Sequence, residues 1–489
     1  MIKKLTQQLF SLSLLSCVVM SAAAAEGSKV HMDHRVTPVP YDDSFFSRDP
    51  DYDLTEYDVK KQLEIYGGKT KYNVPRPLLE LGRRIYDVGP FSESSYIFGR
   101  TNPMDSQLIV YGDWRTAVAS NDNQGFSQSQ IATRLNLDID WKLTGTERVH
   151  ATITPLEKDG RFTRNVFSSD NNITGSEVET DSTLDALYFE GDMGNIVAGF
   201  SNTYSKTDMP FAIGLMPLLF QNGVWFDDAF VGIAASITHM NSPELDISNM
   251  DLSFFIGVDD VSTVVSEGDE SNVSLFGMAA FIEANHGYWE AGYGFTDNSN
   301  NADLAYHNVT VAFTKRYANL ISNSIRVITN FGQSANVKTA DGTLILIENS
   351  YITSKPSTLI PYFNVFFGDG SPQSLARAGA AGGVLKNTGI NFETDGLTGF
   401  PTLTATGRDA MGGAIGVQYL FGFDQQIVVE LATVLDQSDA GLAGNETGFG
   451  VRYQKPLDRK WLMRADAMFA SRDVGKDSSG IRFEIRRKF

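Results

Sequence analysis

GIRFEIRRKF, residues 480–489, ends the chain with an alternation of apolar and charged side chains. Ile481, Phe483 and Ile485 lie on one face of an extended strand, and the terminal Phe489 falls on the same face. This period of two predicts a β-strand with one apolar side and one charged side. A single strand of this kind also suits the edge of a soluble β-sandwich, so other segments must decide between the two.

The ending of this strand adds a second signal. It resembles the C-terminal signature of Gram-negative outer-membrane β-barrels, whose last strand ends in Phe and alternates apolar residues back from it. Arg487 departs from that pattern because it falls on the apolar face, where a long side chain can still reach lipid headgroups. The resemblance implies that the barrel assembly machinery of the outer membrane recognises Phe483, Ile485 and Phe489.

Residues 1–25 are typical of an export signal. Two lysines precede an apolar core at residues 9–20, and a run of small residues at 21–25 predicts cleavage after Ala25. A lipoprotein signal at Cys17 is the alternative, but the apolar run continues past that cysteine. Cleavage removes the only cysteine and both lysines, so the formal net charge falls from −19 to −21. Such acidity disfavours nucleic acid as a partner and favours cations, or divalent ions that bridge to lipopolysaccharide.

The remainder divides at about residue 104. Residues 26–104 lack regular alternation: residues 31–58 suggest an extended lead-in, and residues 53–66 and 77–86 suggest weak helices. We interpret 26–104 as a periplasmic segment that packs on a barrel rim, enters the lumen as a plug or docks a periplasmic partner. From about residue 105 to 489, alternating segments recur. The clearest is residues 134–143, where five apolar side chains alternate with five charged or amide side chains. That polar face needs a wet interior.

These patterns predict an all-β, transmembrane, antiparallel up-and-down β-barrel of about 18 strands, with 16 as the alternative. Short turns are expected at residues 144–147 and 192–195 and near His286, Tyr317, Pro356, Phe423 and Pro456. Longer polar loops are expected at residues 120–130, 157–182, 259–271, 297–302, 332–342, 368–410 and 436–447. Short and long connections alternate, which places both termini in the periplasm.

One connection is apolar where a loop is expected. Residues 209–220 (MPFAIGLMPLLF) and the following 221–225 should be buried, because an exposed apolar patch of this size invites aggregation. We predict a loop that folds into the lumen and forms a constriction, through Phe211, Leu215, Phe220 and Trp225. An extra strand or hairpin, or a surface that docks a partner, remains open.

The charged faces of the first three and last two strands give the candidate lumen residues. When the last strand pairs with the first, they form one wall, in which rows of Arg and carboxylate set a transverse field that tunes solute choice. Ion pairing that only satisfies a wet wall is the alternative. The residues are Asp113, Arg115, Arg134, Asp138, Asp140, Arg148, Arg464, Asp466, Arg482 and Glu484.

The sequence therefore predicts a porin-like channel of the bacterial outer membrane for passive diffusion of small hydrophilic solutes or ions. A conduit that exports a polysaccharide with periplasmic partners and a closed structural barrel are the alternatives, and a homotrimer stays open. None of the six histidines stands in a recognisable nucleophile context, so we expect no enzyme activity. No cofactor is implied. His31, Asp33 and His34, like the acidic residues at 259–270, lack a metal-site pattern, and we expect no bound metal.

Overall fold

The structure is a computed structural model that describes residues 75–82, 94–393, 396–421, 424–438 and 444–489. The expected signal peptide, the lead-in at 31–58 and the helix expected at 53–66 lie outside these residues. Among the described residues, no helix is long and apolar enough to cross a membrane.

Strands make up most of the described chain. They are β1 (Leu79–Gly82), β2 (Gln107–Asn123), β3 (Phe126–Lys142), β4 (Arg148–Ile153), β5 (Glu157–Lys158), β6 (Arg161–Ser169), β7 (Gly175–Glu177), β8 (Ala186–Asp192), β9 (Pro210–Phe220), β10 (Phe226–Ser242), β11 (Ile247–Asp259), β12 (Val273–Ala284), β13 (Gly287–Asn298), β14 (Tyr306–Tyr317), β15 (Ile321–Phe331), β16 (Gly342–Tyr351), β17 (Leu359–Gly370), β18 (Ala376–Arg377), β19 (Ala410–Phe421), β20 (Gln425–Asp436), β21 (Glu446–Pro456), β22 (Trp461–Arg472) and β23 (Ser478–Lys488). The helices are α3 (Met193–Ser201), η4 (Gln221–Gly223), η5 (Pro243–Leu245), η6 (Glu270–Asn272), η7 (Ala302–Leu304), η8 (Gly379–Ala381) and η9 (Lys386–Thr388).

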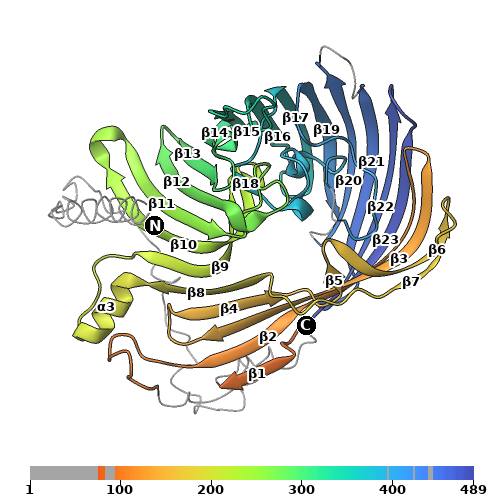
Figure 1. Cartoon of the computed structure of the whole chain (residues 1–489). Coiled ribbons are helices and arrows are strands. Elements are labelled where there is room, and N and C mark those ends of the chain that lie inside the picture. The colour runs from red at the N-terminus through yellow and green to blue at the C-terminus, as the bar shows by residue number, and fades with distance from the viewer. Residues whose placement is uncertain (1–74, 83–93, 394–395, 422–423, 439–443) are drawn as a thin grey trace, which may run out of the picture. The chain divides into compact units, whose positions relative to one another are not determined.

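The strands form a closed antiparallel barrel with 18 strands, which confirms the predicted fold (Figure 1). Neighbours in sequence are neighbours in the wall, and β23 closes the barrel by pairing with β2 from Asp113↔Lys488 to Asp122↔Ser479. One wall position is shared, because β4 covers one half of β3 and β6 covers the other half. A complete ladder leaves no free sheet edge between the first strand and the last.

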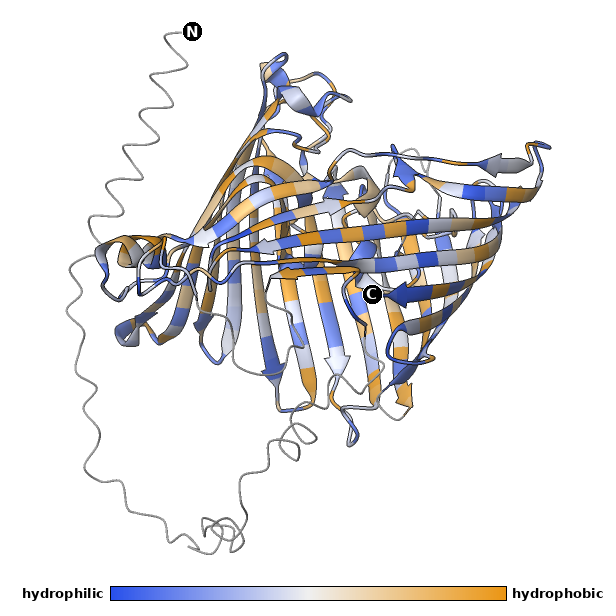
Figure 2. Ribbon diagram, turned by 90° about the horizontal axis from the view of Figure 1, so that it is seen from below, coloured by the Kyte–Doolittle hydropathy of each residue, from blue (hydrophilic) through white to orange (hydrophobic). Residues whose placement is uncertain are grey.

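The outer face of the barrel carries an apolar band. Ile415, Leu431, Phe449 and Phe469 are register partners on four successive strands, and their side chains are 48% to 61% exposed. Along most strands, apolar and polar residues alternate as the period of two requires (Figure 2). An exposed apolar row on a closed barrel with polar inner neighbours is the surface that lipid covers.

Most of the expected short turns are present. Residues 144–147, 285–286, 318–320 and 457–460 each join two strands at the end of the barrel where β2 starts and β23 finishes, which we call the short-turn end. The turn expected near Phe423 lies outside the described residues. Among the described residues the exception is 192–195, where Asp192 caps the N-terminus of α3 by accepting from the backbone N–H of Asn195. The connection is therefore a helix and not a turn.

The other end of the barrel also differs from the prediction in two places. The loop expected at 120–130 is only a two-residue turn, in which Gln124 and Gly125 both have positive φ, as a tight hairpin between long strands requires. The loop expected at 157–182 contains β5, β6 and β7. Both stretches are polar because they rise beyond the apolar band, and polarity alone does not separate a strand there from a loop.

A helix was also expected at residues 77–86, but residues 79–82 form β1. This strand pairs with β2 from Leu79↔Val110 to Gly82↔Gln107, directly beyond the positions that β23 covers. The backbone of Phe489 meanwhile exchanges two hydrogen bonds with Gly112. β1 and β23 therefore pair with successive parts of the same edge of β2, and β1 takes the part near the start of β2.

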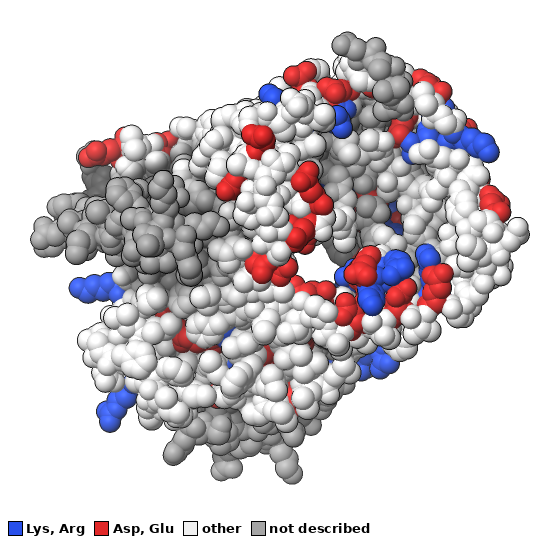
Figure 3. All heavy atoms as spheres, viewed as in Figure 1, with Lys and Arg blue, Asp and Glu red and all other residues white. Residues whose placement is uncertain are grey.

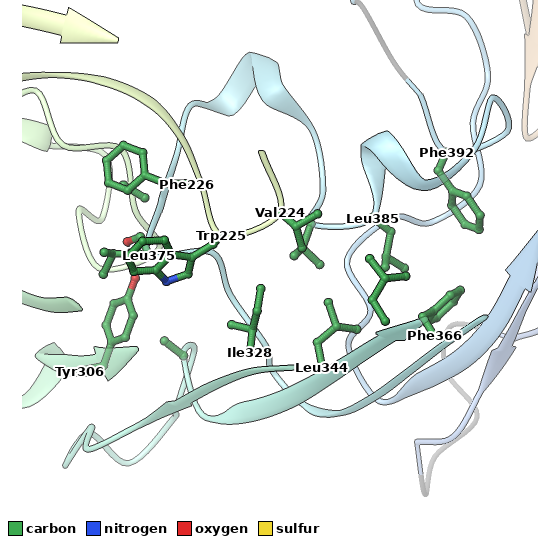
Figure 4. Packing of buried hydrophobic residues seen from close by; sticks show 14 of the residues in the cluster. Val224, Trp225, Phe226, Tyr306, Ile328, Leu344, Phe366, Leu375, Leu385 and Phe392 are labelled. Atoms are coloured by element: carbon green, nitrogen blue, oxygen red, sulfur yellow. The ribbon is translucent and has the colours of Figure 1, made fainter. Parts of the chain in front are cut away.

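An apolar cluster fills one side of the barrel interior. It joins the end of β9, the start of β10, the inner faces of β11–β20 and residues 371–409, which connect β17 to β19 and which we call the inner segment. Trp225, Phe226, Leu375 and Leu385 are at most 1% exposed (Figure 4). Each buried side chain of this size contributes about 1.5–3 kcal/mol relative to exposure. The inner segment is thus held by packing and is not a free external loop.

Candidate functional site

The charged wall is centred on Asp466 of β22. Its oxygens lie 2.7 Å from Nε of Arg452, 2.8 Å from Nε of Arg464 and 2.9 Å from a terminal nitrogen of Arg482. Cross-strand pairing brings these side chains together, because Arg452 on β21 and Arg482 on β23 are the two register partners of Asp466. Three guanidinium groups thus share one carboxylate that is 7% exposed.

Glu393 of the inner segment supplies a second carboxylate to this group. It accepts a hydrogen bond from Arg452 and another, 3.3 Å long, from Arg464. Burial opposes the ionisation of Glu393, but the two guanidinium groups outweigh that cost and lower its pKa. The inner segment is therefore tied to the wall by an ionised group.

Two further carboxylates of the wall hold the same segment. Glu430 on β20 accepts hydrogen bonds from the backbone N–H groups of Ile390 and Asn391, at 3.0 and 2.9 Å, and from the hydroxyl of Tyr362. Glu446 on β21 accepts from the backbone N–H of Thr404 at 2.8 Å. These contacts fix the course of the segment across β20 and β21.

The wall continues across the seam between β23 and β2. Arg115 forms a two-pronged pair with Glu484, with both N···O distances 2.8 Å. Arg486 does the same with Asp113, at 2.7 and 2.8 Å. These pairs join the first wall strand to the last.

On β3, β4 and β8 the charges are more loosely paired. Arg134 lies 3.2 Å from Glu157, and Arg148 lies between Asp140 at 3.8 Å and Glu190 at 3.9 Å. Asp138, the register partner of Tyr111, accepts a hydrogen bond from the hydroxyl of Thr152 at 3.2 Å. This part of the wall leaves carboxylates with fewer hydrogen-bond donors than Asp466 has.

All ten lumen residues named from the sequence thus lie on this inner wall, in two groups joined through the seam. Sequence reasoning missed Arg452, Glu393, Glu430 and Glu446. Arg452 follows the same period-two pattern as the others and could have been found. Glu393 lies in a Gly-rich connection without periodicity, so no local signal indicates its position.

The loop predicted at residues 209–220 is wrong, because residues 210–220 form β9, a wall strand between β8 and β10. Phe211 and Leu215 lie on the outer face, whereas Phe220 and Trp225 point into the apolar cluster, with their rings 5.8 Å apart. β9 lacks alternation because its inner face, including Met216 at 1% exposure, packs on that cluster. The alternative of an extra strand is the one observed.

The inward course belongs instead to the inner segment, which was expected to be an external polar loop at 368–410. Ser374 donates to the carbonyl of Val224 at 2.8 Å, and β18 pairs in parallel with Phe226 and Asp227 of β10. At its far end, Asn121 of β2 donates to the carbonyl of Thr398 at 2.7 Å. The segment therefore runs inside the barrel from β10 to β2.

The interior is divided by this arrangement. Most of the apolar cluster lies on the side of β9–β20, and the charged wall runs from Glu430 on β20 through β21–β23 to β2–β8. In the space-filling view an opening leads into the barrel, and acidic and basic side chains gather together at its edge (Figure 3). Among the described residues, no group of three or more His, Cys, Asp or Glu is arranged to hold a metal ion.

The closed barrel, its apolar outer band and its charged inner wall define a transmembrane β-barrel protein. No protein-family model and no curated protein matches the sequence.

Solved structures do resemble the fold. OccK7 (OpdD) of Pseudomonas aeruginosa superposes with a TM-score of 0.51 at 9% identity, over 78% of this chain and 98% of that chain. OccAB4 of Acinetobacter baumannii gives 0.51 at 10% identity with the same coverage. The outer membrane protein opdK of Pseudomonas aeruginosa gives 0.50 at 12% identity, again over 78% and 98%. At these identities the likeness is one of fold.

Proposed function

We propose that this protein is a channel for the passive diffusion of small hydrophilic solutes or ions across the outer membrane. One observation carries the proposal: the inner segment crosses the barrel from β10 to β2 and covers the wall at β20–β22, while the charged side chains of β3, β4 and β8 pair with one another on the rest of the wall. The porin fold of the structural neighbours agrees with it. The proposal includes no chemical step and no cofactor.

The inner segment takes the role of the constriction in this proposal. Its anchors Glu430 and Glu446 on the wall, and its own Glu393, hold it against β20–β22. A solute passing between the segment and β2–β4 meets paired Arg and carboxylate groups, whose transverse field favours solutes with both charge signs or with large dipoles. The carboxylates of Asp138 and Asp140, which have fewer hydrogen-bond donors than Asp466, add a preference for cations on that side of the opening.

Three further expectations remain predictions. The barrel assembly machinery should recognise Phe483, Ile485 and Phe489, lipopolysaccharide should contact the outer face, and the chain can assemble as a homotrimer. Phe483 is 45% exposed on the outer face, which supports the first of these.

Single-channel recording in planar bilayers tests the proposal. Gly368 and Ala410 are register partners in β17 and β19, so a short hairpin loop can replace residues 374–404 without stretching the wall. We expect steady ion current from the wild type and a conductance several times higher from the shortened variant. As the matched control, replacing residues 170–174 between β6 and β7 should leave the conductance unchanged. A wild type without current, unchanged when the segment is removed, would show a closed structural barrel instead.

A further inference from the structure

The short-turn end of the barrel carries a cluster of cations that contrasts with the acidic chain as a whole. The chain has a formal net charge of −19, yet four basic residues gather where β21, β22 and β23 meet. They are Arg459 and Lys460 in the turn before β22, and Arg487 and Lys488 at the end of β23. Asp424 and Asp458 are the two nearby carboxylates on a cleft of about 680 Å³ that this turn lines with Trp461 and Lys488.

The cluster lies next to an aromatic pair on the lipid-facing side of the wall. Arg487 is the register partner of Trp461 on β22 and of Trp114 on β2, so the three side chains lie on adjacent strands of the outer face. The guanidinium carbon of Arg487 is 5.5 Å from the centre of the Trp461 ring, within cation–π range. Trp461 is 38% exposed and Trp114 is 48% exposed, so both rings are open to lipid.

The turn itself is preorganised. Oδ1 of Asp458 accepts from the backbone N–H groups of Lys460 at 2.6 Å and Trp461 at 2.9 Å. The backbone N–H of Lys488 donates to the carbonyl of Lys460 at 2.7 Å, which ties the end of β23 to the turn. Asp458 therefore caps the turn. The backbone that carries the basic residues is fixed by β22 and β23.

We infer that this cluster binds the phosphate headgroup of an anionic phospholipid in the inner leaflet of the outer membrane. Short turns face the periplasm in barrels of this class, so the cluster lies at the level of the inner-leaflet headgroups. Tryptophan prefers that interface, and Arg and Lys supply the donors that a phosphate accepts. A basic pocket beside membrane-facing strands is the pattern by which anionic lipids are recognised. The position of Arg487 on the apolar face, which departs from the alternation of the last strand, has a purpose in this site.

Fluorescence quenching by brominated lipids tests the inference. The full protein is reconstituted in vesicles that contain a fixed fraction of either brominated phosphatidylglycerol or brominated phosphatidylcholine, and tryptophan emission is measured. The Trp461→Phe variant identifies the share of the quenching that Trp461 contributes. We expect Trp461 to be quenched more strongly by the anionic lipid, with the apparent lipid affinity falling about five-fold for each cation removed.

Two double variants separate a site from general attraction. Arg487→Gln with Lys460→Gln should abolish the preference for the anionic lipid. Arg459→Gln with Lys460→Gln changes only the turn and leaves the last strand intact. It should also abolish the preference, and it replaces the first variant where the loss of Arg487 prevents assembly. Arg316→Gln with Lys355→Gln removes the same charge from two other short-turn positions and should retain the preference.

Three results would overturn the inference: equal quenching of Trp461 by the two lipids, an equal loss in the Arg316 and Lys355 control, or displacement by inorganic phosphate at constant ionic strength. The last would assign the cluster to a free anion. Ion conductance of the same variants is independent of this outcome, so the proposed channel and the proposed lipid site fail separately.

Discussion

At the scale of single residues, the charged wall is held together by guanidinium groups that share carboxylates. Asp466 is contacted by three guanidinium groups, and Arg452 and Arg464 reach further to Glu393. The group holds three positive and two negative charges, so each carboxylate has excess positive charge beside it. Removing either carboxylate leaves three buried guanidinium groups beside a single carboxylate, which costs more than one pair contributes.

Glu393 gives a pH-dependent prediction. Its pKa lies below the ordinary value of 4.5, so its contribution to stability is complete above that value and is lost as the pH falls through the lowered pKa. We expect the conductance of the wild type to be constant between about pH 7 and pH 5 and to change below about pH 4. Glu393→Gln should lack the acid step and should lose about 1–2 kcal/mol of stability at pH 7, measured by urea unfolding.

Glu177→Gln is the matched control, because Glu177 pairs with Arg164 on β6 and not with Arg452 or Arg464, which hold Glu393. Its acid step should match that of the wild type. An acid step that persists in Glu393→Gln would show that another group governs the position of the inner segment.

At the scale of elements, glycines on the inner face make room for the inner segment and the apolar cluster. A Cβ on Gly292 would lie 2.5 Å from the ring of Trp225, and one on Gly294 would lie 2.2 Å from Leu375. Gly450 is similarly close to Asn391. Glycines therefore take the inward-facing positions where the interior is already filled. This explains why β13 shows weak alternation.

We expect Gly292→Leu to displace Trp225 and loosen the inner segment. The barrel should still form, because the ladder of β13 is unchanged, but trypsin should cut the segment at Arg377, Lys386 or Arg408, which mass spectrometry detects. Gly145→Leu is the control, since nothing lies within 4 Å of its Cβ position. Protection of the segment in Gly292→Leu equal to that in the control would contradict the packing described here.

The same elements show what the sequence could and could not predict. Alternation is local, so the barrel, the polar inner faces and most short turns follow from it, as residues 134–143 illustrate. The inner segment was missed because its partners, such as Glu430 and Glu446, are distant in sequence and its own residues have no period. β9 was misread because both of its faces are apolar, one against lipid and one against the buried cluster. Hydrophobicity does not tell these two environments apart.

At the scale of the whole molecule, the barrel is closed by β2 and β23 alone, and β1 only extends the row beyond β23. We therefore expect a chain without residues 26–104, but with its export signal, to insert and conduct as the wild type does. Conductance per channel and heat-dependent mobility on gels measure the two properties. Normal conductance with loss of a transported polymer in cells would favour an exporter that takes its cargo through residues 26–104.

The seam has a consequence for how the protein is made. Arg115 and Glu484 are 369 positions apart, and Arg486 and Asp113 are 373 apart, so their ion pairs join the earliest-synthesised and latest-synthesised strands of the wall. Contacts at such separation form slowly, because a long loop must close first. Until that moment neither of these two ion pairs can form. A folding chain must therefore keep these edges in contact with water, or with a catalyst that shields them, until its own ends meet.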